Sequence, residues 1–332
     1  MLAQELGIDL GSAHTVVVSK SKGIVAREPS VVAIDQDTKQ VIAVGEAAHR
    51  MVGRTPDSIL PVHPVRSGVI SDMNGSTVLL KHMIRTVARS RWLRPYLLIP
   101  IQADASDVDK RALAQAASQA GAAVLDLVPE TVAAALGAGL PVDEPMGSLL
   151  MDIGSGTTDV AVISLGGVVL SASAPVAGKA MDDAVARHLK KYHNLLVGQP
   201  TAERLKIELG SALPGGEAQL SVTGRLLTTG RPSSVTISAA DVYEAAKDLL
   251  EQIDALVLGV LERTPPELLA DISHSGLTLT GGGALLHRLP ERLARVTGLP
   301  VTVAEDPIEA VARGAQQLLQ RRAKVILERV KI

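Results

Sequence analysis

Two short loops repeat one residue pattern in the two halves of the chain. The first reads Asp9-Leu10-Gly11-Ser12, and the second reads Asp152-Ile153-Gly154-Ser155-Gly156-Thr157-Thr158. When Asp9 is set against Asp152, the Asp, Gly, Ser and Thr positions coincide, and each loop lies between an apolar run and a Val-rich run. A short match arises by chance, but matching context on both sides favours a duplication. We therefore expect two similar α/β lobes with a cleft between them. Two ordinary hairpin turns are the alternative.

The length and composition agree with two lobes. A chain of 332 residues is longer than one core usually spans. The hydrophobic content of 46% is ample, but aromatic residues make up only 1% and Phe is absent, so Val, Leu, Ile and Ala must fill the cores. The formal net charge of -2 gives no global field that would attract nucleic acid.

The cellular compartment is expected to be the reducing cytoplasm. Cysteine is absent, which excludes disulfides, thiolate catalysis and Cys-based metal sites. Residues 1–6 are too short for a signal peptide, because Asp9 soon interrupts the apolar run. No stretch approaches the roughly 18 apolar residues that a membrane span needs.

Strand-like and helix-like runs alternate, as is typical of an α/β protein. Strands are expected at residues 16–19, 31–34, 41–44, 149–151, 160–164, 168–171 and 277–280. Helices are expected at 106–120, 182–192, 202–209, 239–263 and from 284 to about 295, with Ser106 as an N-cap. Residues 224–234 read as turn-rich.

The two loops have the parts of a phosphate site. Glycines allow close approach of backbone N–H donors, and Ser or Thr hydroxyls add further donors. An Asp beside phosphate is explained if a divalent cation lies between them, and Mg²⁺ needs only one or two carboxylates because it keeps several waters. We therefore interpret Asp9 and Asp152 as partners of Mg²⁺ through water.

Two further features fit a nucleotide site less specifically. Thr280-Gly281-Gly282-Gly283 follows an expected strand and would let backbone lie flat against a nucleoside, although a plain strand–helix turn reads the same way. Glu130 precedes an expected helix. Its carboxylate could orient a water toward a γ-phosphate, or it could simply be a favourable charge at a helix N-terminus.

At this point the sequence resembles the MreB family of bacterial actin homologues. Residues Leu6-Gly7-Ile8-Asp9-Leu10-Gly11-Ser12 are similar to its first phosphate loop, and residues 152–158 are similar to its second. The similarity covers nearly the whole chain, with further matches at residues 27–34, 53–56, 68–70, 133–141, 160–167, 262–266, 280–286 and 303–307.

The resemblance implies an actin-like α/β fold with two lobes. Each lobe would have a duplicated ribonuclease-H-like core and a smaller inserted subdomain. The implied boundaries are 1–32, 66–144 and 317–332 for subdomain IA and 33–65 for IB. They are 145–181 and 252–316 for IIA, and 182–251 for IIB.

The resemblance also assigns site residues. Glu130 falls on the family's water-orienting glutamate, which supports a catalytic role beside Asp9 and Asp152. The implied ATP or ADP contacts are Gly11, Ser12, Ala13 and His14; Gly154, Ser155, Gly156, Thr157, Thr158 and Gly178; Glu203, Arg204, Leu205 and Lys206; and Gly281, Gly282, Gly283 and Ala284.

Four departures from the family pattern bear on turnover. His14 stands where the family usually has Asn, and Thr131 stands where it has Pro. Lys179 replaces an acidic residue after Gly178, and the turn over residues 100–106 is about two residues longer than usual. A typical hydrolysis rate is therefore not assumed.

The implied function is an ATP-dependent filament that maintains rod shape by organising wall synthesis at the inner membrane face. Its partners would be further copies of itself in paired protofilaments, anionic membrane, and membrane proteins of cell shape and wall synthesis. Trp92 and Leu93, flanked by Arg, would insert into the membrane, although a Trp buried beside a helix end is the alternative.

Other functions of the same superfold remain open at this stage. A plasmid- or organelle-positioning filament would share fold and motifs. A small-molecule kinase would need a substrate motif that is not visible. A chaperone ATPase would need about 200 further residues for a substrate domain.

Overall fold

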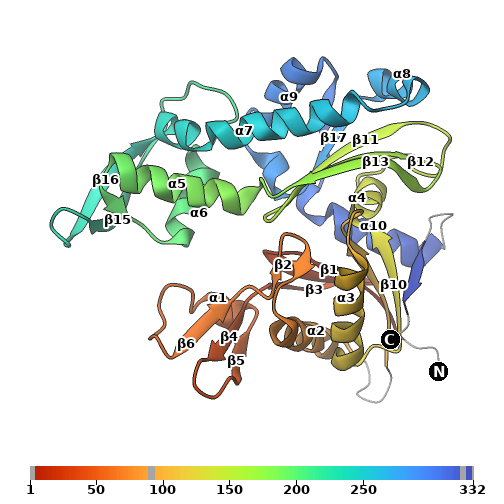
Figure 1. The fold of residues 1–332 in the computed structure, drawn as a ribbon, viewed down its shortest axis with the longest axis horizontal. Helices are drawn as coiled ribbons and strands as arrows, with labels where there is room; N and C mark the ends of the chain where they lie inside the picture. The colour runs from red at the N-terminus through yellow and green to blue at the C-terminus, as the bar shows by residue number, and fades with distance from the viewer. Residues whose placement is uncertain (1–3, 89–93, 322–326, 331–332) are drawn as a thin grey trace.

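The computed structural model describes residues 4–88, 94–321 and 327–330, and it has two large sheets stacked one above the other in Figure 1. The first sheet has the strand order β19-β10-β9-β1-β2-β3, and the second has the order β13-β12-β11-β17-β18. The strands of the first are β1 (Glu5–Leu10), β2 (His14–Ser19), β3 (Gly23–Pro29), β9 (Tyr96–Ile101), β10 (Val124–Pro129) and β19 (Glu328–Val330). Those of the second are β11 (Ser148–Ile153), β12 (Thr158–Ser164), β13 (Gly167–Ala174), β17 (Leu277–Thr280) and β18 (Val301–Val303).

The two sheets repeat one topology. In the first, β1 is antiparallel to β2 and β2 to β3, whereas β9 is parallel to both β1 and β10. In the second, β11 is antiparallel to β12 and β12 to β13, whereas β17 is parallel to both β11 and β18. The same order and sense of five strands confirm the duplication that the two loops predicted.

Each sheet carries a smaller inserted part at the same topological position. In Figure 1 both insertions lie on the left. The first follows β3 and contains β4 (Val32–Asp35), β5 (Val41–Val44), α1 (Glu46–His49), β6 (Ile59–Val62), β7 (Val65–Arg66) and β8 (Val69–Ile70). The second follows β13 and contains α5 (Gly178–Tyr192), β14 (Leu195–Leu196), α6 (Gln199–Leu209), β15 (Gln219–Leu226), β16 (Pro232–Ser238) and the start of α7 (Ala239–Leu261).

The remaining helices cover the sheets. They are α2 (Met73–Val87), α3 (Asp107–Ala120), α4 (Glu130–Gly137), α8 (Pro266–Ser275), α9 (Leu289–Thr297), α10 (Ala310–Arg321) and two short 3₁₀ helices, η1 (Gly282–Leu285) and η2 (Pro307–Glu309). Ser106 is the N-cap of α3, as predicted from the sequence. It also forms a reciprocal capping box with Asp109. Ser238 and Asp241 do the same at the start of α7.

Helices α4 and α10 cross between the two sheets (Figure 1). A Cβ added at Gly137 would lie 1.8 Å from the carbonyl oxygen of Ala310, and one added at Gly314 would lie 1.7 Å from that of Ala133. The missing side chains therefore allow backbone-to-backbone approach. Around this crossing one apolar core joins both lobes, because it contains Leu98 of the first sheet and Leu150 of the second.

Three sequence expectations differ in part from the structure. The helix expected from 284 to about 295 is divided into the 3₁₀ helix η1 and the α-helix α9. In the stretch 224–234, expected to be turn-rich, residues 227–231 form the turn of a hairpin, and the residues on either side belong to the paired strands β15 and β16. Helix α5 begins at Gly178, four residues before the expected start, because the backbone N–H groups there bond to the second loop.

Within the described ranges, no helix combines the length and apolarity that crossing a bilayer requires. Trp92 and Leu93 lie outside the described residues.

Candidate functional site

The two repeated loops face each other across the lobes. Each is a tight turn between the first two strands of its sheet, with Leu10 opposite Thr15 in one and Ile153 opposite Thr158 in the other. A Cβ added at Gly156 of the second loop would lie 2.8 Å from the hydroxyl oxygen of Ser12 in the first loop. The duplication therefore brings two glycine-containing turns into direct contact.

Buried hydroxyl groups fix the shape of both loops. Ser30 donates its hydroxyl to the carbonyl of Gly11 at 2.6 Å and lies 2.8 Å from the hydroxyl of Thr15. In the second loop, Thr158 donates its hydroxyl to the carbonyl of Val176 at 2.5 Å. Each threonine at the end of the motif thus anchors its turn to a neighbouring segment, and contact of Thr158 with a nucleotide stays a prediction.

Three carboxyl groups converge where strands end. Asp9 is near the end of β1, Asp152 near the end of β11, and Glu130 is the first residue of α4 directly after β10. Burial and the charge of Asp152 raise the pKa of Asp9 to about 7. Burial raises the pKa of Asp152 to about 6, against a hydrogen bond from Thr280 that lowers it. Burial and the charges of Asp152 and Asp9 raise the pKa of Glu130 well above its usual range.

This cluster fits a divalent cation. Among the described residues, none of the three carboxylates forms an ion pair with Lys, Arg or His. Like charges that lie close together in a partly buried site disfavour ionisation, whereas a bound cation reverses that effect. Hard oxygen donors of this kind suit Mg²⁺, which binds through one or two carboxylates and retains several waters.

The third glycine-rich loop packs against the second. Thr280 donates its hydroxyl to Asp152 at 2.6 Å, so the end of β17 orients this carboxylate. Gly281 has φ 78°, and a Cβ there would lie 2.3 Å from the carbonyl oxygen of Ile153. Only glycine fits that combination of left-handed backbone and close contact. Gly282 is open, with no heavy atom within 4 Å of an added Cβ.

Helix α5 begins against the second loop. The backbone N–H of Gly178 donates to the carbonyl of Gly154 at 3.2 Å, and that of Lys179 donates to the carbonyl of Ser155 at 2.8 Å. Lys206 of α6 lies on the same helix start, because it donates to the carbonyl of Gly178 at 3.2 Å and pairs with Asp182 at 2.8 Å. Lys206 is thereby held beside the second loop, and its contact with a nucleotide stays a prediction.

The other residues expected on α6 and in the third loop face different surroundings. Leu205 and Ala284 are fully buried in hydrophobic clusters, so their side chains are directed into the cores. Arg204 is half exposed and lies 3.9 Å from Glu208 on its own helix. Their contact with a nucleotide stays a prediction.

Histidines of the first lobe lie opposite charged residues of the second. Burial, together with the positive charges of Arg27 and His49, lowers the pKa of His14, while Glu203 opposes that shift. Burial and the charge of Lys179 lower the pKa of His63, which also interacts with the backbone of Ser12.

His63 and Asp182 were missed by the sequence reasoning. Asp182 is almost fully buried, and burial raises its pKa to about 6 against the opposing effect of Lys206. The sequence signal for Asp182 was an acidic residue four positions after Gly178, and its burial became visible in the structure. His63 had no local signal.

Comparison with known proteins identifies relatives of the chain. The family model described as "MreB/Mbl protein" matches residues 3–326. "Cell shape-determining protein MreB" of Escherichia coli (strain K12) is 45% identical over 327 residues, covering 96% of this chain and 94% of that protein. "Cell shape-determining protein Mbl" of Bacillus cereus (strain ATCC 10987 / NRS 248) is 42% identical over 322 residues, covering 96% and 97%.

A solved structure agrees with these matches. The crystal structure of MreB 5 of Spiroplasma citri bound to AMPPNP has a TM-score of 0.91 to this chain at 34% sequence identity, with 96% of each chain covered. The repeated sheets, the facing loops and the match over nearly the whole length lead to one conclusion: the chain belongs to the MreB/Mbl family.

Proposed function

We propose that the chain binds ATP and ADP with Mg²⁺ between its lobes and uses nucleotide binding to form filaments that maintain cell shape. The observation that carries the proposal is the convergence of two facing glycine turns on the carboxylates of Asp9 and Asp152. Family membership supports it, since relatives are called cell shape-determining proteins. A similar solved structure is described as bound to AMPPNP, and another as bound to ADP.

We assign a binding role to each group of residues from its place in the local structure. Backbone N–H groups of the two turns, with the hydroxyls of Ser12, Ser155 and Thr157, would hold phosphate. Asp9 and Asp152 would hold the cation through water, and Thr280 keeps Asp152 oriented for that task. Mg²⁺, when bound, supplies neutralisation of phosphate charge. Gly282, open to its surroundings, would face the nucleoside together with Glu203 and Lys206 of α6.

Glu130 is proposed to orient the attacking water for a slow ATPase reaction. A raised pKa leaves more of this carboxyl protonated when no cation is near, and a nearby cation favours the ionised form that can accept a hydrogen bond from water. His14, Thr131 and Lys179 stand at departures from the family pattern, so the rate is a property to be measured on this chain.

The proposed assembly is a homopolymer of paired protofilaments at the inner face of the cytoplasmic membrane. Anionic lipid would bind Trp92 and Leu93, and membrane proteins of cell shape and wall synthesis would be further partners. The formal net charge of -2 gives no support to nucleic acid as a partner.

Filament assembly is the discriminating test. The full chain is incubated with ATP and Mg²⁺, and then pelleted and viewed by electron microscopy. Filaments are expected with the unaltered chain and are expected to be lost or reduced in Asp152→Asn, which keeps the side-chain oxygen facing Thr280. The absence of filaments with any nucleotide, together with transfer of phosphate to a metabolite, would contradict the proposal.

A second test isolates the role of Glu130. Glu130→Ala is expected to slow phosphate release by about 10²-fold or more while ATP binding stays intact, because only the positioning of water is lost. Phosphate release and binding of a fluorescent ATP analogue are measured side by side. An unchanged rate in the variant refutes the role.

A further inference from the structure

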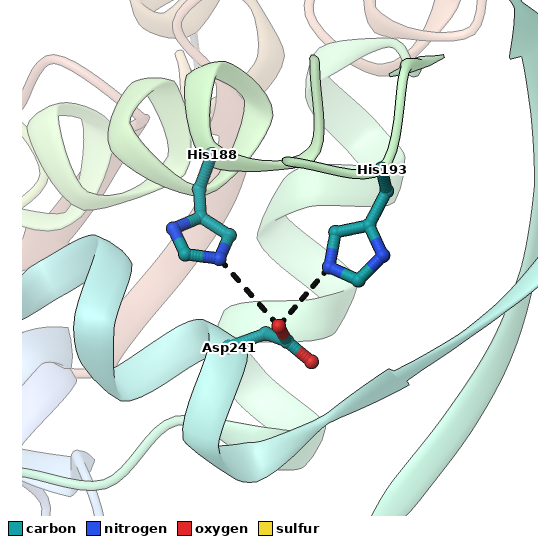
Figure 2. A group of neighbouring side chains, drawn as sticks. All are labelled: His188, His193 and Asp241. Carbon is teal, nitrogen blue, oxygen red and sulfur yellow. Dashed lines mark hydrogen bonds and ion pairs between the residues drawn. The ribbon is translucent and has the colours of Figure 1, made fainter. Parts of the chain in front are cut away.

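Three potential metal ligands meet at the end of α5 that is remote from the two facing loops. His188 is in the last turns of α5, His193 is its C-cap residue, and Asp241 is in the first turn of α7. Figure 2 shows both imidazole rings pointing from the end of α5 toward one oxygen of Asp241. The ligand atoms of these three side chains lie close enough together to hold one metal ion directly.

The end of the helix is what brings the two histidines together. In a continuous α-helix, residues five apart are rotated by roughly 140° from each other, so their side chains diverge. His193 is a C-cap with φ -109° and ψ 0°, and the chain leaves the helix there. The two rings consequently come to within 6.1 Å of each other, measured between centroids, on the side that faces α7.

The ligand atoms already have distances close to those of a tetrahedral site. Oδ1 of Asp241 lies 3.0 Å from Nε2 of His193 and 3.5 Å from Nε2 of His188. Around Zn²⁺, bonds of about 2.0–2.1 Å give ligand-to-ligand distances of about 3.3 Å. All three ligand atoms lie within 4.8 Å of one another, so side-chain rotations of both histidines are enough to close the site.

Asp241 is held in the orientation that such a site needs. Its Oδ2 accepts hydrogen bonds from the backbone N–H of Ser238 at 2.9 Å and from the hydroxyl of Ser238 at 2.6 Å. These bonds belong to the capping box of α7, so they are maintained whether or not an ion binds. Oδ1 is left to face the two rings, and an outer partner of this kind increases metal affinity.

The chemistry of the ligands and their exposure select the ion. Two imidazoles and one carboxylate favour Zn²⁺ and similar transition-metal ions over Mg²⁺, which prefers oxygen donors. The side chains are 13%, 21% and 25% exposed for His188, His193 and Asp241. Water can therefore reach the centre and fill a fourth position. We propose that His188, His193 and Asp241 form a binding site for a divalent transition-metal ion, with Zn²⁺ as the best-matched ion.

The alternative is a hydrogen-bond network that binds no metal, with Asp241 accepting from the two histidines. Metal titration distinguishes the proposed metal site from this hydrogen-bond network, because the network would bind no ion. Full-length chain without an added histidine tag is titrated with ZnCl₂ in excess Mg²⁺ and followed by calorimetry. Co²⁺ then serves as a second probe, since tetrahedral Co²⁺ with nitrogen ligands absorbs visible light strongly. One ion per chain is expected for both metals.

Matched variants locate the site. His188→Gln and His193→Gln are each expected to weaken Zn²⁺ binding at least tenfold and to abolish the Co²⁺ spectrum. His274→Gln is the control, because His274 is an exposed histidine on α8 whose ring bonds to Ala270 of its own helix. Asp152→Asn separates this site from the proposed nucleotide site, and Zn²⁺ binding is expected to be unchanged in it.

Thermal unfolding gives an independent measure. Zn²⁺ is expected to raise the unfolding midpoint of the unaltered chain, because it ties the end of α5 to the start of α7, and to leave His188→Gln and His193→Gln unmoved. Circular dichroism without metal verifies that each variant is folded. The proposal is overturned if the unaltered chain binds no Zn²⁺ under these conditions, or if both histidine variants bind it as tightly as the unaltered chain does.

Discussion

The repulsion between the clustered carboxyl groups is most directly measurable at Asp9. Burial and Asp152 raise its pKa from 3.8 to about 7. Between about pH 4 and pH 7, Asp9 is therefore ionised in the unfolded chain but still protonated in the folded chain. The contribution of Asp9 to the free energy of unfolding consequently falls as pH rises from about 4 to 7, and it stays unfavourable above that range.

The first prediction follows from this sign. In the absence of metal and nucleotide, Asp9→Asn is expected to raise the free energy of unfolding at pH 8 by about 1–2 kcal/mol, less than the full shift implies because the carboxyl is partly exposed. At pH 4 the gain is expected to vanish. Urea unfolding at both pH values measures it, with the exposed Asp57→Asn as control. Equal effects at both pH values would contradict the argument.

Thr131 has a buried hydroxyl group whose removal is expected to stabilise the fold. Its side chain is 2% exposed, and its hydroxyl has no hydrogen-bond partner among the described residues. A buried hydroxyl without a partner costs about 1–3 kcal/mol. Thr131→Val keeps the shape of the side chain and is expected to raise the free energy of unfolding by about 1 kcal/mol in denaturant titration. A loss of stability would mean that the hydroxyl has a partner after all.

Sequence reasoning located some of these residues and missed others for identifiable reasons. The two loops could be predicted because Asp, Gly, Ser and Thr recur in them at the same spacing and in matching context. His63, His188 and His193 carry no such signal. Each histidine is a candidate site residue only because of a neighbour that is distant in sequence. The neighbour is Ser12 for His63 and Asp241 for the other two.

At the scale of elements, the crossing of α4 and α10 is the most demanding contact. Gly314→Ala would place a methyl group 1.7 Å from a backbone oxygen of Ala133, and backbone cannot move aside as a flexible side chain does. Overpacking of this kind costs about 1–3 kcal/mol or more. We expect a loss of about 3 kcal/mol in the free energy of unfolding.

A matched control for Gly314→Ala lies on α7. An added Cβ at Gly259 meets nothing within 4 Å. Gly259→Ala should therefore raise the free energy of unfolding by about 0.5–1 kcal/mol through helix propensity alone. If both glycine variants changed stability in the same direction, the crossing would not be the cause.

The N-cap of α3 was predicted from the sequence, whereas the pairing of β15 with β16 was not. Ser106 and Asp109 are neighbours in sequence, so their pattern is local. The strands of the β15–β16 hairpin do alternate, with Leu220, Val222 and Ile237 directed inward between exposed polar residues. The Gly, Pro and Ser residues in the stretch 224–234 read as turn and concealed this alternation. The proposed subdomain boundaries stay predictions, and the one at 316/317 falls within α10.

At the scale of the whole molecule, the repeated loops predicted the repeated sheets correctly. Five strands in each lobe share order and direction, and this topology places both loops at equivalent strand ends. No short sequence motif indicated that β17 and β18 join the second sheet as parallel strands, because parallel pairing is set by contacts between segments far apart in the chain.

Attachment to membrane is a prediction for the assembled molecule. Trp92→Ser combined with Leu93→Ser is expected to reduce co-sedimentation with anionic liposomes by about tenfold or more, because the apolar insertion is lost while the flanking Arg residues remain. Val108→Ser is the control, since Val108 is an exposed apolar residue on α3. Unchanged liposome binding in the double variant would rule out these residues as the anchor.

The crossing of α4 and α10 also determines how the chain can be divided. Helix α4 follows the first sheet but packs in one core with Leu150, Ala161 and Ile163 of the second. Helix α10 follows the second sheet, yet Ala315 contacts Gly7 of the first. A fragment that contains a single lobe would therefore expose the apolar face of a helix and lack the helix that covers its own sheet. Separately expressed halves should be insoluble alone and should regain structure only when they are produced together.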